Sequence, residues 1–196
     1  MDKQPKTGVY KSMISVIVPS YNEPKIHDLV NEIEQEIGPA QIVIYNDRYG
    51  KGKGYAIREA LEQATGDYYI FIDGDRDIPP REIFKIIFYL NEYDIVVGRK
   101  ALPRKLKRKL LTFLSRIWIW LLFRIEVDTQ TGIKGFNYKP EWKTDGWAFD
   151  IEILYKARKD KKTMQQIPIH ATVSDGKSFK DILSTLIDTI KIRMGL

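Results

Sequence analysis

Apolar residues follow two different periods along this chain, and the two periods take turns. Short continuous apolar runs, typical of buried strands, are followed by stretches with apolar residues every three or four positions, typical of helices with one buried face. Strands are expected at 14–18, 42–45, 68–72, 95–97 and 166–173, and helices at 24–37, 54–64, 80–90, 104–124, 149–158 and from 179 onward. Three successive strand–helix units predict an α/β fold, with a mainly parallel sheet and helices on both faces.

The length of 196 residues fits one domain with a substantial core. We expect the core to span about 12–175 and an amphipathic helix to follow at about 178–194. The absence of cysteine excludes disulfides, thiolate zinc sites and thiol nucleophiles. With only His27 and His170, a histidine-built metal site is also disfavoured.

Polar clusters follow the predicted strands, where ligands of parallel sheets bind. The clearest is Asp73, Asp75 and Asp77, which would face one side if the chain stays extended. Carboxylates of this kind suit Mg²⁺ or Mn²⁺. An EF-hand is excluded because Ile78 and Phe84 occupy its glycine and glutamate positions. The simpler alternative is a polar turn that caps the next helix.

The segment Gly50–Gly54 contains three glycines and two lysines at the start of a helix. Backbone N–H groups and lysines there could hold phosphate, but neither the P-loop nor the dinucleotide pattern fits. A phosphate loop and a flexible turn both remain open.

Four short motifs resemble glycosyltransferase family 2, on the GT-A fold. Pro19–Glu23 matches its Pro-x-Tyr-Asn-Glu opening and Asp73–Asp75 its Asp-x-Asp pattern, while Asp128–Phe136 and Trp147–Glu152 are similar to the dolichyl-phosphate glucose and mannose synthases. The resemblance implies an inverting, metal-dependent transfer of a hexose from a nucleoside diphosphate to a polyprenyl or dolichyl phosphate.

Site roles follow from the same resemblance. The donor would be bound by residues after the first three strands: Pro19, Tyr21, Glu23, Asp47, Lys53 and Asp73. Asp75 and Asp77 would hold Mg²⁺ or Mn²⁺ at the diphosphate. One departure is that Asn46-Asp47 replaces the usual pair of aspartates, which makes base recognition the least transferable role.

The acceptor side is basic. A phosphate monoester is already anionic near neutral pH, so it needs cations rather than a general base. Arg99, Arg108 and Lys134 suit this task, and by resemblance Arg99 and Arg108 lie with Thr112 at the lipid phosphate. The expected catalytic residues are thus Asp75, Arg99 and Asp128, the last tuning the site electrostatically.

Other functions remain open at this point. A family 2 enzyme acting on a sugar hydroxyl would use Asp128, Asp150 or Glu152 as base. A nucleotidyltransferase would need a glycine-rich loop after the first strand, which 19–24 lacks. A nucleic-acid-binding module would use the basic run 99–109 but leaves the aspartates unexplained, so no nucleic acid partner is expected. The donor could be UDP-glucose or GDP-mannose.

The helix predicted at 104–124 indicates where in the cell the protein acts. Its second half is apolar nearly all round and carries Trp118 and Trp120 beside a basic cluster, as in helices that lie in a membrane interface. The run Ile117–Phe123 is too short to span a bilayer, and the polar residues 1–11 predict no secretion. We therefore expect a peripheral protein on the cytoplasmic face of an anionic membrane.

Overall fold

The computed structural model describes residues 13–21, 23–24, 26–100, 106–129, 131–172 and 179–195, with side chains described except at 106–112 and 179–183. The expected side-chain contacts of Arg108 and Thr112 lie outside this description, as do Arg104 at the start of a predicted helix and Val173 at the end of a predicted strand.

Six strands form one sheet in the order β2-β1-β3-β5-β4-β6. They are β1 (Ile14–Ser20), β2 (Gln41–Asn46), β3 (Tyr68–Ile72), β4 (Ile95–Lys100), β5 (Ile133–Phe136) and β6 (Met164–Ile169). β5 lies between β3 and β4 and runs antiparallel to both, while the other pairings are parallel. All four residues of β5 are buried, as expected for a central strand.

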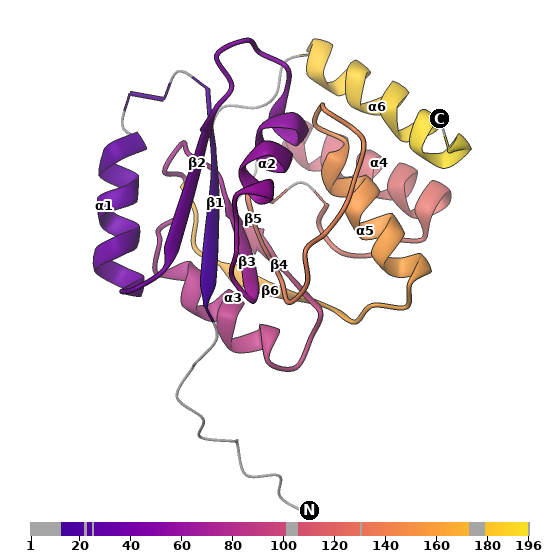
Figure 1. Ribbon diagram of the computed structural model, residues 1–196. Helices are drawn as coiled ribbons and strands as arrows, with labels where there is room; N and C mark the ends of the chain where they lie inside the picture. The colour runs from indigo at the N-terminus through magenta and orange to yellow at the C-terminus, as the bar shows by residue number, and fades with distance from the viewer. Residues whose placement is uncertain are drawn as a thin grey trace, which may run out of the picture.

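Helices cover both faces of the sheet (Figure 1). They are α1 (Ile26–Ile37), α2 (Lys53–Glu62), α3 (Glu82–Leu90), α4 (Leu106–Phe123), α5 (Phe149–Lys159) and α6 (Phe179–Met194). One apolar cluster joins the sheet to α1 and α3, and a second joins its other face to α2, α4 and α5. α6 lies outside this second layer, where the Trp118 indole N–H donates to Thr189 Oγ1 at 3.0 Å.

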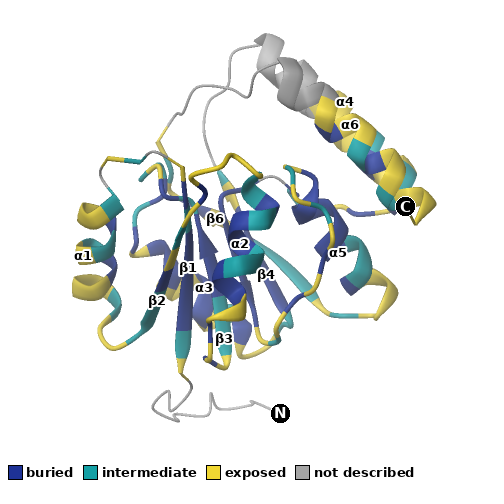
Figure 2. Ribbon diagram, turned by 45° about the horizontal axis from the view of Figure 1, so that its top comes forward, coloured by how far each residue is buried: buried dark blue, intermediate teal, exposed yellow. Residues whose placement is uncertain are grey.

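The predicted helical stripes point into these clusters. Leu29 and Ile33 of α1 are fully buried, and Figure 2 shows the opposite side of α1 exposed. The predicted α/β sandwich is therefore confirmed. Three details differ. The sequence pattern predicts no strand at 133–136, where the structure has β5, and the last strand runs from Met164 to Ile169 rather than over 166–173. Residues 74–76 form a turn, so the extended arrangement of Asp73, Asp75 and Asp77 is wrong.

Candidate active site

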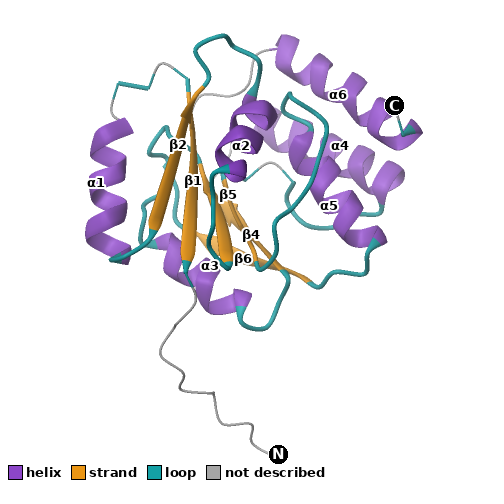
Figure 3. Ribbon diagram, viewed as in Figure 1, coloured by secondary structure: helices purple, strands orange, loops and turns teal. Residues whose placement is uncertain are grey.

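The loops after β1, β2 and β3 meet at one edge of the sheet, at the top of Figure 3. A Cβ atom on Gly74 would lie 2.8 Å from the Pro19 carbonyl oxygen, and one on Gly50 would lie 3.8 Å from the Tyr21 ring. Tyr21 is 58% exposed, and Pro19 and Glu23 are partly exposed. The structure therefore gathers the residues predicted to bind the nucleoside around an accessible edge.

Asp47 has a structural task in this edge. Its side chain is buried, and its Oδ2 accepts the Gly52 N–H at 2.7 Å, while its carbonyl oxygen accepts the Gly50 N–H at 3.1 Å. The carboxylate thus shapes the glycine-rich loop.

The glycines of that loop are required by close packing. A Cβ on Gly52 would lie 2.4 Å from the Asp145 carbonyl oxygen, and one on Gly54 would lie 2.3 Å from that of Thr144. The Tyr55 N–H also donates to the Asp145 carbonyl at 3.0 Å. The loop is therefore held against residues 144–145 rather than being a free turn.

Lys53 leaves this loop and forms an ion pair with Asp73 at the end of β3. Its ammonium also lies 5.3 Å from the centre of the Trp147 ring. Burial alone would lower the pKa of Lys53, but the carboxylates of Asp73 and Asp150 raise it above its ordinary value. Lys53 is therefore protonated and positively charged at this edge of the sheet near neutral pH.

A second ion pair, Lys134 with Asp150, lies next to the first and is buried. Lys134 of β5 is 2% exposed, and its ammonium is 3.0 Å from Asp150 Oδ1 and also donates to the Thr131 carbonyl oxygen. Burial raises the pKa of the Asp150 carboxyl, while the charge of Lys134 acts in the opposite direction. Cations and carboxylates thus alternate from Asp73 through Lys53 and Asp150 to Lys134.

Glu152 lies two residues after Asp150 on α5, and its side chain is held by several donors. It accepts backbone N–H groups of Lys143 and Thr144, the Thr144 hydroxyl at 2.7 Å and the Lys156 ammonium at 2.9 Å. Burial would raise its pKa, but these partners together lower it below the ordinary value. The carboxylate fastens the segment before α5 and is not free to act as a base.

The aspartates after β3 have separate partners. Asp77 lies 3.3 Å from the Lys100 ammonium and accepts the Thr172 hydroxyl at 3.1 Å. Asp75 is exposed, and its Oδ1 accepts the Asp77 N–H at 3.0 Å. Partial desolvation of its carboxyl, together with the nearby Asp73 charge, raises the pKa of Asp75.

A divalent cation fits this loop chemically. Within the described residues no three His, Cys, Asp or Glu side chains form a complete metal cluster. A pair of hard carboxylates with further ligands from a bound phosphate is, however, the usual arrangement for Mg²⁺. Asp75 and Asp77 fit such a partial ligand set.

The predicted acceptor residues are more scattered. Arg99 is exposed at the end of β4, on the same edge, whereas Lys134 is buried against Asp150. Asp128 forms an ion pair with Arg116 of α4, with 3.4 Å between Asp128 Oδ2 and Arg116 Nη2. The sequence analysis does not single out two cations at the aspartate loop, Arg76 and Lys100. Arg76 stands between Asp75 and Asp77 in the sequence, which was an available signal, whereas Lys100 is 23 residues from Asp77 and meets it only in the folded sheet.

Apolar side chains are exposed along α4 and α6. We call them the apolar helix surface, which consists of Phe113, Leu114, Ile117, Trp120, Leu121, Leu186, Ile187, Ile190 and Met194. Arg124 stacks on Trp120 at 4.4 Å. None of the described helices combines the length and apolar character needed to cross a bilayer.

Comparison with known proteins gives one consistent result. The chain is 24% identical over 246 residues to dolichyl-phosphate beta-glucosyltransferase of Saccharomyces cerevisiae, with 93% of this chain and 72% of the relative covered. The human protein of the same name is 25% identical, with 88% and 71% covered.

Solved structures share the fold. Glucosyl-3-phosphoglycerate synthase from Mycobacterium tuberculosis, in complex with Mn²⁺, UDP-glucose and phosphoglyceric acid, superposes with a TM-score of 0.74 at 15% identity, covering 95% of this chain and 81% of that one. Mannosyl-3-phosphoglycerate synthase from Rubrobacter xylanophilus gives a TM-score of 0.69 at 17% identity, with 93% and 73% covered. The family model described as glycosyl transferase family 2 matches residues 26–174. Since that match spans most of the chain and agrees with the fold, the protein belongs to glycosyl transferase family 2.

Proposed function

We propose that this protein transfers a hexose from a nucleoside diphosphate to a polyprenyl or dolichyl phosphate at a membrane surface, inverting the anomeric configuration and requiring Mg²⁺ or Mn²⁺. The observation that carries the proposal is the meeting of Lys53, Asp73 and Asp75 at the carboxyl edge of the sheet, in a chain related to dolichyl-phosphate glucosyltransferases. UDP-glucose is the favoured donor and GDP-mannose the alternative.

The nucleoside would be lined by Pro19, Tyr21, Glu23 and Asp47. Lys53 would hold the phosphates, and Asp73 would orient Lys53 and the sugar. Asp75 and Asp77 would hold the cation, which supplies Lewis-acid stabilisation of the departing diphosphate. The solved neighbour that contains Mn²⁺ and UDP-glucose supports the proposal of a divalent cation together with a nucleotide sugar.

A phosphate acceptor suits the acceptor side better than a hydroxyl does. Glu152 is engaged by backbone and side-chain donors, and Asp150 is paired with buried Lys134, so neither is a free general base. A phosphate oxygen is already a nucleophile and needs only to be held by cations. Arg99, with Arg108 and Thr112, would hold it, while Lys134 contributes its charge through Asp150 and Asp128 tunes the site.

The apolar helix surface would bring the enzyme to its lipid acceptor on the cytoplasmic face. It combines aromatic and aliphatic side chains with the cations Arg116 and Arg124, which suits an anionic bilayer surface. Trp118, by contrast, turns inward to α6.

The test is a matrix of donors and acceptors with Mn²⁺. UDP-glucose, UDP-galactose, GDP-mannose and GDP-glucose are each offered with polyprenyl phosphate, polyprenol, 3-phosphoglycerate and free glucose. We expect turnover with polyprenyl phosphate and one donor, abolished by EDTA. Preferred transfer to 3-phosphoglycerate, polyprenol or glucose would refute the lipid-phosphate acceptor.

A further inference from the structure

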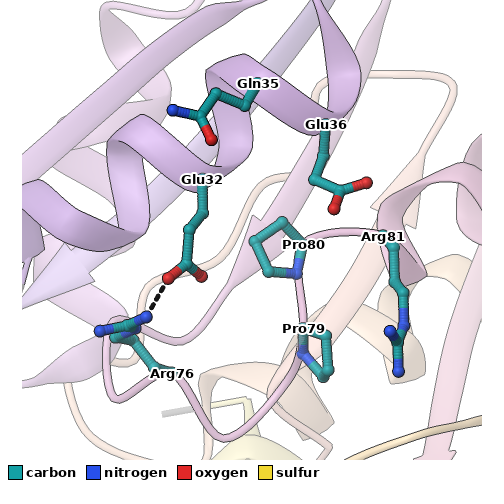
Figure 4. A pocket seen from close by; sticks show the side chains of 7 residues that line it. All are labelled: Glu32, Gln35, Glu36, Arg76, Pro79, Pro80 and Arg81. Carbon is teal, nitrogen blue, oxygen red and sulfur yellow. Dashed lines mark hydrogen bonds and ion pairs between the residues drawn. The ribbon is translucent and has the colours of Figure 1, made fainter.

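Arg76 lies between the two aspartates of the proposed cation site, yet it points away from them. Its guanidinium forms an ion pair with Glu32 of α1, and its Nη1 lies 3.5 Å from Asp28 Oδ2, one turn earlier on the same helix. Figure 4 shows Arg76 and Glu32 joined across the pocket between α1 and the aspartate loop. The side chain therefore ties this loop to a helix 44 residues earlier in the chain.

The backbone of Arg76 is in a left-handed conformation, with φ of 61°. This region disfavours residues with a Cβ, and glycine is the usual occupant. An arginine here needs compensation from elsewhere, and the two carboxylates on α1 supply an anchor for it.

The left-handed residue sets the shape of the loop. It reverses the chain so that the Asp77 N–H returns to Asp75 Oδ1 at 3.0 Å. Gly74 on one side is pressed against Pro19, and the Thr172 N–H donates to the Asp77 carbonyl at 2.8 Å on the other. Arg76 therefore anchors the middle of the loop at 74–77, in which Asp75 is the exposed residue.

We propose that Arg76 is a positioning residue that holds Asp75 and Asp77 ready for the cation by anchoring their loop to Asp28 and Glu32 of α1. The inference rests on the proposed function, because it assumes that these aspartates bind the cation. A positioning role and a simple charge effect predict opposite changes in cation affinity when Arg76 is removed. A bare positive charge beside the site would repel the cation, so removing it would tighten binding, whereas removing an anchor would weaken it.

The test is direct Mn²⁺ binding by the full chain in the presence of UDP or GDP, followed by the free Mn²⁺ signal in electron paramagnetic resonance. Arg76→Ala should weaken Mn²⁺ binding about threefold to fivefold, the size expected for one exposed ion-pair anchor. The double variant Asp28→Asn/Glu32→Gln should weaken it similarly, although both changes are on α1. Arg81→Ala, in the same pocket, is the matched control and should stay within about twofold.

Two further variants separate the anchor from the backbone. Arg76→Gly relieves the left-handed strain but still loses the anchor, so it should also weaken Mn²⁺ binding. The exchange Arg76→Glu with Glu32→Arg should recover part of the loss, and melting temperatures should change little throughout. If wild type binds Mn²⁺ but Arg76→Ala and the α1 double variant bind equally well or better, the inference is overturned. If wild type binds no Mn²⁺ with either nucleotide, the proposed function fails instead.

Discussion

Side chains of the same type at neighbouring sequence positions have different contacts in this protein. Asp73, Asp75 and Asp77 look alike in the sequence, but one pairs with Lys53, one is exposed and one lies by Lys100 and Thr172. Their different surroundings predict different sensitivities to substitution.

Asp75→Asn should abolish Mn²⁺-dependent donor turnover while the protein still folds, because the change removes an anionic ligand from an exposed loop. Turnover and thermal unfolding measured on the same preparation check this, with Asp77→Asn as the companion variant. The companion should also lose turnover but melt lower, because the Asp77 carboxylate pairs with Lys100 and accepts the Thr172 hydroxyl, and the substitution weakens these contacts. Wild-type turnover in Asp75→Asn would remove this residue from the cation site.

Arg99→Ala should impair transfer to polyprenyl phosphate far more than it impairs donor binding. A lost charge-assisted hydrogen bond to phosphate costs about 1.5–3 kcal/mol, or roughly tenfold to a hundredfold in rate. Steady-state kinetics with varied acceptor, beside UDP-sugar binding by calorimetry, separate the two effects. An indifferent Arg99→Ala would point to a neutral acceptor and a protein base.

At the scale of elements, the segment before α5 closes the site from the side. Trp142 donates its indole N–H to the Gly54 carbonyl at 3.1 Å, and Arg58 of α2 pairs with Asp145. Glu152 holds the same segment from α5. The glycine-rich loop, Lys53 and Trp147 therefore depend on a contact between distant parts of the chain.

This dependence predicts a pH effect on stability. The folded protein lowers the pKa of Glu152, so its contribution to stability is complete above the unfolded value of about 4.3 and is lost as the pH falls below it. The melting temperature of wild type should exceed that of Glu152→Gln near pH 7, and the difference should shrink toward pH 3. Glu34→Gln, at an exposed position on α1, is the control. A difference that does not depend on pH would contradict the account.

Local pattern predicted most elements because each buried strand or helical stripe is read from neighbouring residues. It could not predict what distant residues decide. The turn at Arg76 depends on α1, the glycines at 52 and 54 on residues 144–145, and the burial of Lys134 on Asp150 of α5. A lysine predicted to grip phosphate therefore lies beneath the site, bound to a carboxylate.

At the scale of the whole molecule, apolar exposure is concentrated on the layer that contains α4 and α6. This predicts association with vesicles of anionic lipid, through apolar burial and attraction of cations together. Co-sedimentation should weaken but persist at high salt, because only the charge contribution is screened.

The surface itself can be tested by substitution. Phe113→Ser with Leu121→Ser, at positions 59% and 57% exposed, should reduce vesicle binding strongly. Phe84→Ser with Phe88→Ser is the matched control, since these exposed side chains are on α3 at the opposite face of the sheet. Equal losses in both pairs, or no binding by wild type at low salt, would contradict the assignment.

The central position of β5 also bears on the order in which the sheet can assemble. β5 separates β3 from β4, so the sheet remains in two parts until residues 133–136 enter between them. During synthesis the edge of β3 is open in the meantime, which is a recognised risk for aggregation. The same strand carries Lys134, the partner of Asp150. The charge arrangement behind the active site therefore needs both this central strand and α5, which follows it in the chain and carries Asp150.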